Sequence, residues 1–388
     1  MPRPRLVVLA SHPIQYFAPL FRELAQRTSL ELLVVFESDM GLVDYHDAQF
    51  GKSFRWDIPL TQGYEHVFIG RYDSRTAHGR PSPAGLVRLA RLVKNADAVL
   101  LMTFLTRASL LALLTARVSG TRVLYRTEST RLLARTRREE AARVLVLRSL
   151  LSQVDVALYV GAKNREYLSH YGVSDARLVF SPYAVDNEFF LGLAEKLLPR
   201  KPELREQFGL EPELPVFLFC GKLIDKKQPL LLLEAFSRVR RELPCQLLYA
   251  GDGELRAAIE ARVAADEIPN VRVTGFLNQT ELPAAYAASD VLVLPSKGFE
   301  TWGLVVNEAM CFGLPAIVSD RVGSGYDLIE EGVTGRVIGW DDRERLCDTL
   351  RELGSDAVKC RSWGTRARTR VMNYSPRAAA DGIEAALA

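Results

Sequence analysis

The sequence predicts an α/β protein with two doubly wound domains, each a parallel sheet covered by helices on both faces. Two observations support this prediction. The chain has 388 residues, more than one ordinary hydrophobic core accommodates. Short apolar runs rich in β-branched residues alternate along it with longer segments of helical period. This alternation is typical of βαβ units, whose strands are buried on both faces.

In the first half, six such runs are expected to form one parallel sheet. They read RLVVLAS, ELLVVFES, AVLLMTF, TRVLYRTE, VDVALYVG and RLVFSPY. Helical patterns such as YFAPLFRELAQR and PAGLVRLARLVKNA lie between them. Residues 39–80 do not follow this rhythm, and we expect this polar and aromatic segment to form ligand-binding loops at the mouth of the sheet.

The second half repeats the rhythm and predicts a second parallel sheet. Its strands are expected at VFLFCG, CQLLYAG, VRVTG, DVLVLPS and PAIVSD. Helices are expected at QPLLLLEAFSRVRREL, ELRAAIEARVAAD and GLVVNEAM. Residues 198–214, rich in proline and charge, mark the boundary. We therefore expect domains at 1–195 and 196–370, followed by a C-terminal helix at 371–388.

The net charge of +3 is unevenly distributed along the chain. Residues 1–190 hold 25 Lys and Arg against 18 Asp and Glu, whereas the remainder holds 25 against 29. The excess of +7 in the first half indicates an anionic partner, such as a phosphate-bearing molecule or a membrane surface. Solvated surface arginine is the alternative interpretation.

The cysteine pattern and the apolar runs predict a cytoplasmic protein. All five cysteines lie in the second half without CxxC spacing, which favours reduced thiols over disulfides or a zinc ribbon. The apolar run after Arg5 is too short for a signal peptide. The longest apolar stretch, 98–116, is interrupted by Arg107 and does not fit a membrane span.

Several familiar motifs are absent or incomplete. AGDGELR has Arg256 where a dinucleotide fingerprint needs its third glycine. The sequence contains no GxxxxGK[ST], HExxH or GxSxG. The DYHD segment at 44–47 could ligate a metal, but a polar loop is the favoured interpretation. Aromatic residues are not interleaved with basic ones, so no nucleic-acid partner is expected. We expect neither a bound metal nor a resident cofactor.

Ligands of parallel sheets bind beyond the carboxyl ends of the strands, so residues at these positions are the first candidates. Lys222, Lys226 and Lys227 follow one predicted strand closely. Clustered lysines there can neutralise a diphosphate as point charges. Surface lysines at the start of a helix are an equally good interpretation when this segment is taken alone.

The segment FETWGLVVNEAM, 299–310, places Glu300 and Glu308 eight residues apart around Gly303. If a helix begins near Gly303, its free N–H groups form an anion site. Glu300 then lies in the loop and Glu308 in the second turn of the helix. Carboxylates beside a phosphate are poor anion ligands but good acceptors for sugar hydroxyls. The pair therefore predicts a nucleotide sugar, with one glutamate on the hexose and the other on the ribose.

At residues 215–340 the chain resembles the retaining GT-B glycosyltransferases with an E-x7-E motif, of the glycosyltransferase family 4 type. Glu300 and Glu308 match that motif, and CGKLIDKKQP resembles G-[RK]-x5-K-G. GDGELR, VRVTGFLNQTELPAAYAASDVLVLPS and NEAMCFGLPAIVSD fit the same pattern. The first half, with SHPIQYFAPLFREL and YRTES, resembles bacterial members from polysaccharide assembly. The resemblance implies two Rossmann-like domains facing a central cleft, with the final helix crossing back to the first domain.

The resemblance also implies roles for individual residues. Lys222 and Lys227 would bind the donor diphosphate. Glu300, Thr301 and the backbone from Trp302 through Gly303 to Leu304 would hold the transferred sugar and its phosphate. Glu308 would bind the ribose, and Phe276 with Leu277 would meet the base. Lys222, Lys227 and Glu300 are the catalytic candidates within this set.

The implied reaction is metal-independent transfer with retention from a nucleotide diphosphate sugar to a hydroxyl acceptor. A UDP-sugar is the expected donor, with GDP- and ADP-sugars as alternatives. The acceptor is a carbohydrate, a glycolipid or a small molecule, in bacterial glycan, glycolipid or glycosylated-metabolite synthesis. Two other functions stay open: an inactive scaffold that supports a partner transferase, and a nucleotide-sugar epimerase.

Three departures from the family pattern affect these roles. Lys222 replaces the more frequent arginine, which loses bidentate geometry but keeps the charge. Gln228 stands where glycine is usual. The strand-end histidine of many relatives is missing near 102–103. His12 and Glu128 are the candidate catalytic substitutes, although His12 could be structural and Glu128 could instead pair with Arg126 or Arg131.

An arginine-rich segment at 131–150 predicts a helix with Arg131, Arg135 and Arg138 on one stripe. Such a stripe could contact anionic lipid headgroups, which would place the protein at the inner face of the membrane. An acidic acceptor or a solvated helix face would explain the same pattern.

Overall fold

The computed structural model describes residues 3–388 except 48, 74–77, 133–135 and 299, and describes only the backbone at 78, 137, 138 and 142. The chain divides into two compact units. The N-terminal unit comprises residues 1–46, 53–185 and 375–388. The C-terminal unit comprises residues 186–374 together with the short segment 47–52. Each unit is described on its own.

Within its described residues, the N-terminal unit contains a seven-stranded sheet with parallel pairing throughout. The order is β11 (Leu178–Phe180), β10 (Val156–Tyr159), β9 (Arg122–Thr127), β8 (Ala98–Leu101), β1 (Arg5–Ala10), β2 (Glu31–Phe36) and β5 (His66–Phe68). The central strands are almost fully buried. This burial on both faces explains their continuous apolar sequences.

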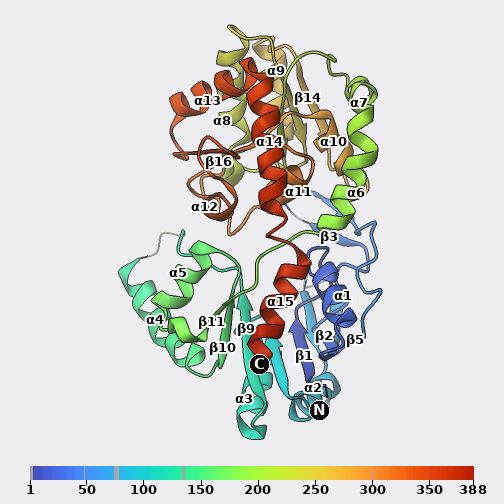
Figure 1. Cartoon of the computed structure of the whole chain (residues 1–388), viewed down its shortest axis with the longest axis vertical. Coiled ribbons are helices and arrows are strands. Elements are labelled where there is room, and N and C mark those ends of the chain that lie inside the picture. Colours follow the sequence, from blue (N-terminus) through green and yellow to red (C-terminus); the bar gives the residue numbers. More distant parts are fainter. Residues whose placement is uncertain (1–2, 48, 74–77, 133–135, 299) are drawn as a thin grey trace. The chain divides into compact units, whose positions relative to one another are not determined.

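Helices cover both faces of this sheet (Figure 1). One face is covered by α2 (Pro83–Lys94), α3 (Arg107–Ser119), α4 (Arg137–Leu151) and α5 (Ala162–His170). The other face is covered by α1 (Ala18–Gln26) and α15 (Pro376–Leu387), which pack against each other. Helix α15 buries Ala379, Ala380 and Ile383 in the same core as β1 and β2. The last helix of the chain thus belongs to the N-terminal unit.

The structure differs from the sequence prediction at residues 39–80. This segment is not loop alone: β5 extends the main sheet as a parallel edge strand beside β2. Two short hairpin-like sheets also form there, from β3 (Tyr45–Asp47) with β4 (Lys52–Phe54) and from β6 (Gly70–Asp73) with β7 (His78–Pro81). These strands have three or four residues each and mixed polarity, so they leave no periodic signal.

The helix predicted at 131–150 is wrong in its first part, because α4 begins only at Arg137. Thr136 caps it, accepting from the Glu139 N–H while the Glu139 carboxylate accepts from the Thr136 N–H. This capping box fixes the start of the helix. Arg131 therefore lies before the helix, Arg135 lies outside the described residues, and no side chain is described for Arg138. The predicted stripe of three arginines on one helix is not formed.

The C-terminal unit contains a six-stranded parallel sheet in the described residues. The order is β14 (Val271–Gly275), β13 (Gln246–Ala250), β12 (Val216–Cys220), β15 (Val291–Leu294), β16 (Ala316–Ser319) and β17 (Gly335–Ile338). Its helices are α6 (Asn187–Leu197), α7 (Lys201–Gln207), α8 (Pro229–Arg240), α9 (Arg256–Ala265), α10 (Leu282–Ala288), α11 (Val305–Cys311), α12 (Gly325–Leu328), α13 (Arg343–Ser355) and α14 (Ala357–Val371). Two parallel-sheet α/β units confirm the predicted fold class.

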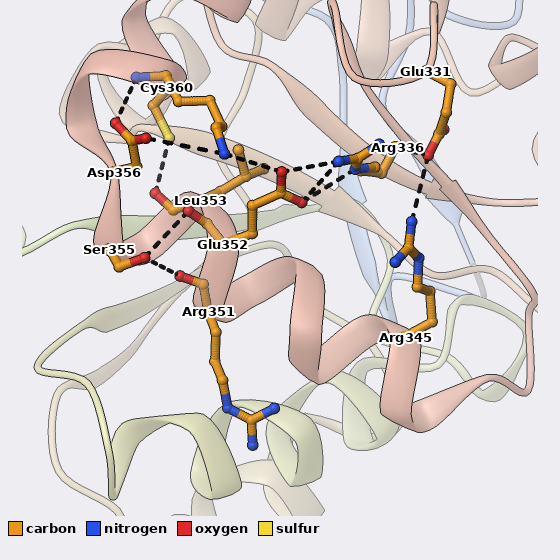
Figure 2. A network of polar contacts seen from close by, with 10 residues as sticks. Glu331, Arg336, Arg345, Arg351, Glu352, Leu353, Ser355, Asp356 and Cys360 are labelled. Atoms are coloured by element: carbon orange, nitrogen blue, oxygen red, sulfur yellow. Dashed lines mark hydrogen bonds and ion pairs between the residues drawn. The ribbon is translucent and has the colours of Figure 1, made fainter.

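The edge strand β17 was not predicted, and a polar network joins it to α13 and α14 (Figure 2). Arg336 on β17 donates to Glu352 from Nη2 to Oε1 at 2.9 Å and from Nε to Oε2 at 3.2 Å. Glu352 also accepts from Lys359 Nζ at 3.2 Å, and Arg336 donates to Glu331 at 3.0 Å. Bidentate pairing of this kind is strong and directional. It holds an edge strand with only four residues.

Among the described residues, none of the helices is both long enough and apolar enough to cross a bilayer.

Candidate functional site

The candidate donor site lies at the point where the strand order of the C-terminal sheet reverses. Strand β12 is followed in sequence by β13 and β14 on one side and has β15 on the other. Such a switch point opens a crevice beyond the carboxyl ends of the strands and is where open α/β sheets bind ligands. Lys222 and Lys227 follow β12, and Glu300 follows β15. The topology alone therefore brings these three residues to one place.

Lys227 and Glu300 form an ion pair at this point, with 3.0 Å between Nζ and Oε2. Their side chains are only 13% and 15% exposed. Burial acts to raise the pKa of Glu300, but the positive charges of Lys227 and Lys226 and hydrogen bonds from Lys227 and Ser296 outweigh it and lower the pKa. Glu300 is thus held as a carboxylate. Gly221, with φ +134°, lets Lys227 cross the end of β12, since a Cβ there would lie 3.1 Å from its Nζ.

Lys222 is engaged by the segment 47–52, which clusters with the C-terminal unit. Its Nζ donates to both oxygens of Asp47, at 3.0 and 2.9 Å, and to Oε1 of Gln49 at 2.8 Å. It also lies 4.9 Å from the ring centre of Phe50. Burial opposes ionisation of Asp47, yet the hydrogen bonds and charge of Lys222 lower its pKa. A carboxylate therefore sits where an anion would contact Lys222. Sequence analysis missed this partner, 175 residues away.

Glu300 through Leu304 form a loop that packs against residues 322–324. The Glu300 carbonyl accepts from Gly323 N–H at 3.0 Å, and the Trp302 carbonyl accepts from Ser324 N–H at 2.9 Å. Gly303 adopts φ +92°, a left-handed conformation that favours glycine. The Trp302 side chain is buried and donates from Nε1 to Asn307 at 2.8 Å. The Trp302 side chain is thus engaged within the unit, and the binding role of its backbone stays a prediction.

Helix α11 begins at Val305, so Glu308 lies in its first turn and not in the second as predicted. Its carboxylate is fully buried and accepts from the hydroxyl of Tyr286 at 2.6 Å. That hydroxyl also lies 3.3 Å from Sγ of Cys220, the last residue of β12. The buried side chains of Tyr286 and Cys220 therefore connect Glu308 to the carboxyl end of β12. Tyr286 is a further residue that sequence analysis missed.

Phe276 and Leu277 follow β14 and are both half-buried. The ring of Phe276 contacts Phe50 edge to face, with 5.0 Å between centroids, and Lys52 Nζ lies 5.3 Å from its centre. Lys52 also lies 4.0 Å from Asp252, which follows β13. The segment 47–52 thus contacts Phe276, one of the two residues expected to meet the base, as well as Lys222.

The structure explains two features of the motifs. Gly251 and Gly253 of the GDG segment pack on the main chain after β12: a Cβ would lie 1.8 Å from the Gly221 carbonyl at the first and 2.7 Å from the Leu223 carbonyl at the second. These glycines serve close packing between neighbouring strand ends. Gln228, where the family favours glycine, adopts a left-handed φ of +53°. Its Nε2 donates to the carbonyls of Pro295 and Trp340, both at 2.7 Å, which stabilises that conformation.

His12 and Glu128, the candidate catalytic substitutes, lie in the N-terminal unit, whereas the group around Glu300 lies in the C-terminal unit. His12 Nδ1 is 3.0 Å from Ser11 Oγ. Glu128 is exposed and hydrogen-bonds the hydroxyl of Tyr183. Glu128 and Arg126 interact through their charges, whereas the guanidinium group of Arg126 donates hydrogen bonds to Ser181 and Pro182.

A buried carboxylate at the switch point of the N-terminal sheet also escaped sequence analysis. Glu37 follows β2 and accepts from Thr106 Oγ1 at 2.7 Å and from Thr103 Oγ1 at 3.2 Å. Burial raises its pKa, and the two threonine hydroxyls only partly offset this effect. A carboxylate directly after a buried strand, in ELLVVFES, is the signal that could have identified it.

We expect His12 to make folding stability depend on pH. Burial lowers the pKa of His12 from 6.5 to about 4. Between these values the unfolded chain binds a proton that the folded chain does not, so stability falls as the pH falls from 6.5 towards 4. Denaturant unfolding of the wild type and His12→Asn should show that the wild type loses its stability relative to the variant across this window. A difference that is independent of pH contradicts the burial of His12.

The cysteines and the DYHD segment show no metal chemistry among the described residues. All five cysteines are free and buried. In the ranges that the structure describes, no three His, Cys, Asp or Glu side chains are grouped so as to hold a metal ion. Asp47 of DYHD instead binds Lys222.

Residues 200–370 match the model of the family described as glycosyl transferases group 1. The chain is 31% identical over 187 residues to the alpha-D-kanosaminyltransferase of Streptomyces kanamyceticus, covering 47% of this chain and 48% of that protein. It is 37% identical over 177 residues to the sulfoquinovosyl transferase SQD2 of Arabidopsis thaliana, covering 45% and 33%. The chain thus spans about half or less of the length of these curated relatives.

The whole chain is similar to solved structures as well. The structure of Anabaena Alr3699/HepE in complex with UDP and glucose superposes with a TM-score of 0.71 and 15% identity, covering 99% of both chains. At this identity the likeness concerns the fold. The matched model covers the unit that contains Lys222, Lys227, Glu300 and Glu308. The chain therefore has the GT-B fold, and its residues 200–370 match the glycosyl transferases group 1 model.

Proposed function

We propose that this protein is a glycosyltransferase that moves a sugar, with retention of configuration, from a nucleotide diphosphate donor to a hydroxyl acceptor. The observation that supports it most is the buried Lys227–Glu300 pair at the switch point of the C-terminal sheet. A cation and a carboxylate held 3.0 Å apart there suit a ligand that joins a phosphate to a sugar hydroxyl.

The donor would use the strand ends of the C-terminal unit. Lys222 and Lys227 would neutralise the diphosphate, and Glu300 would accept from hydroxyls of the transferred sugar. Glu308 would serve the ribose, and Phe276 with Leu277 the base. A UDP-sugar is the proposed donor: the Anabaena structure holds UDP and glucose, whereas a relative from Corynebacterium glutamicum is named as GDP-mannose-dependent.

The proposed chemistry needs neither a metal nor a protein base. The leaving diphosphate gains negative charge as the glycosidic bond breaks, and fixed lysine charges stabilise that charge. The acceptor hydroxyl would attack on the face from which the diphosphate departs, and a phosphate oxygen would take its proton. Lys227, whose side chain is only 13% exposed, is already in place and needs little reorganisation during this step.

The acceptor is proposed to be a carbohydrate, a glycolipid or a small molecule that contacts the N-terminal unit, in cytoplasmic synthesis of a bacterial glycan or glycosylated metabolite. Glu37, Thr103 and His12 at the carboxyl ends of β2, β8 and β1 are its closest candidates. Carboxylate, hydroxyl and imidazole groups at neighbouring strand ends suit the recognition of hydroxyl groups.

A turnover assay tests the activity. The full chain is incubated with UDP-glucose, UDP-galactose, GDP-mannose and ADP-glucose, with and without a glycolipid extract, and released nucleoside diphosphate is measured. We expect slow hydrolysis of one donor even without acceptor, and none in Lys227→Ala. Binding without any release would indicate a non-catalytic scaffold, and conversion into another nucleotide sugar would indicate an epimerase.

We expect Asp47→Asn to improve donor binding. A diphosphate that uses Lys222 must displace the Asp47 carboxylate, and an amide makes weaker hydrogen bonds to an ammonium group than a carboxylate does. The donor KM should fall about 3- to 10-fold, which corresponds to about 0.7–1.4 kcal/mol, with little change in kcat. Asp44→Asn, three residues earlier in DYHD and without this contact, is the matched control. An unchanged or raised donor KM contradicts the competition.

A further inference from the structure

The surface formed by α2 and α3 in the N-terminal unit is unusually apolar and basic. Of the thirteen large hydrophobic side chains that are exposed among the described residues, four lie on these two helices. Leu114 is 63% exposed and Val118 is 83% exposed. The helices pack against each other, so these side chains share one surface. We call it the α2–α3 face and define it by Val87, Arg88, Arg91, Leu110, Leu114 and Val118.

The two helices explain the surface through their sequence period. Helix α3 buries Ala108, Ala112 and Ala116 against the sheet. Its opposite side carries Leu110, Leu114 and Val118 at spacings of four residues. Helix α2 buries Leu89 and Val93 and turns Val87, Arg88 and Arg91 outward. These exposed aliphatic side chains therefore do not contribute to the hydrophobic core of the unit.

The charge on these helices has one sign. PAGLVRLARLVK and RASLLALLTARVS contain five basic residues and no acidic one. Arg117 is paired with Asp155, 3.0 Å away at the rim. Within the part of the chain that the structure describes, no ion pair engages Arg88, Arg91 or Lys94. The face thus presents unneutralised cations beside exposed aliphatic groups.

We infer that the α2–α3 face binds the surface of an anionic phospholipid membrane. Aliphatic side chains on a helix enter the boundary between headgroups and acyl chains, while arginine and lysine reach anionic headgroups. Charge complementarity favours this occupant, because the two helices carry basic residues and no acidic ones, and Asp155 at the rim is paired with Arg117. The face replaces the predicted arginine stripe at 131–150 as the membrane-contacting surface. It does not depend on the proposed transferase activity.

Vesicle sedimentation of the full chain tests this inference. We expect the wild type to sediment with vesicles of equal phosphatidylglycerol and phosphatidylcholine at least about tenfold more strongly than with phosphatidylcholine alone. Salt at about 0.5 M should reduce this binding, since it screens the contribution of the cations. Arg88→Glu/Arg91→Glu should lose at least about tenfold in vesicle affinity, and Leu114→Ser/Val118→Ser should lose binding as well.

A matched control lies on the C-terminal unit, where Val358 is 69% exposed beside the exposed Arg361. Val358→Ser/Arg361→Glu changes the same chemistry and should bind vesicles as the wild type does. Thermal melting shows that each variant folds. Equal binding to both vesicle types, retained binding in both face variants, or equal loss in the control overturns the inference. A dimer that dissociates in Leu114→Ser/Val118→Ser, without vesicle binding, assigns the face to a second copy and also overturns it.

Discussion

Lys227→Ala is expected to abolish most sugar transfer and to destabilise the C-terminal unit. The substitution removes the ammonium group that lies 3.0 Å from Glu300 Oε2 and leaves that largely buried carboxylate without this ion-pair partner. Breaking a buried pair in this way costs about 3–5 kcal/mol of stability. Loss of a fixed charge on the leaving diphosphate should lower kcat/KM by about 10²- to 10³-fold. Denaturant unfolding and steady-state kinetics measure the two effects separately.

A double variant separates stability from chemistry. Lys227→Ala/Glu300→Gln removes the orphaned charge, so we expect it to regain most of the lost stability while transfer stays as low as in the single variant. Lys297→Ala is the control, because its partner Asp225 is largely exposed, and it should change stability by less than about 1 kcal/mol. If the double variant recovers transfer, the pair is structural and Lys227 has no role in chemistry.

Glu308→Ala should impair both stability and donor binding. The substitution empties a fully buried position and leaves the Tyr286 hydroxyl without its 2.6 Å acceptor. The cavity and the lost hydrogen bond should cost about 2–4 kcal/mol. A lost hydrogen bond from the donor ribose to a carboxylate should raise the donor KM by about 10- to 100-fold.

Tyr286→Phe distinguishes the two roles of Glu308. This variant removes only the buried hydroxyl that holds Glu308. If Glu308 binds the ribose directly, Tyr286→Phe should change the donor KM by less than about threefold, since the carboxylate remains. An equal increase of the donor KM in both variants would mean that Glu308 acts only by positioning Tyr286, and the ribose assignment would be wrong.

The sequence predicted the architecture where strands are buried on both faces. The runs that became β1, β8, β12 and β15 are continuous and apolar, because parallel strands lie between two layers of helices. The edge strands β11 and β14 were predicted as well, but the edge strands β5 and β17 were missed because they lack this constraint. β17 has four residues with two half-buried positions, and the three residues of β5 are all half-buried. The start of α4 was misplaced because its capping box at Thr136 and Glu139 was not recognised.

The candidate site was predictable only as far as it follows from strand ends and motif spacing. Glu300 and Lys227 meet because adjacent strands β12 and β15 end side by side. Their neighbours were not predictable in this way. Asp47 reaches Lys222 from a segment 175 residues earlier, and Tyr286 reaches Glu308 from another helix. Such contacts depend on tertiary packing, which no local period records.

Binding of a nucleotide sugar to the Lys227–Glu300 cluster is the central claim, and saturation-transfer NMR of the full chain with UDP-glucose, GDP-mannose and ADP-glucose tests it most directly. We predict saturation of both the ribose and the hexose protons of one donor. The signal should be displaced by the matching nucleoside diphosphate and should be absent in Lys227→Ala/Glu300→Gln, which is expected to remain folded. No saturation with any donor, or an unchanged signal in that variant, would contradict the claim.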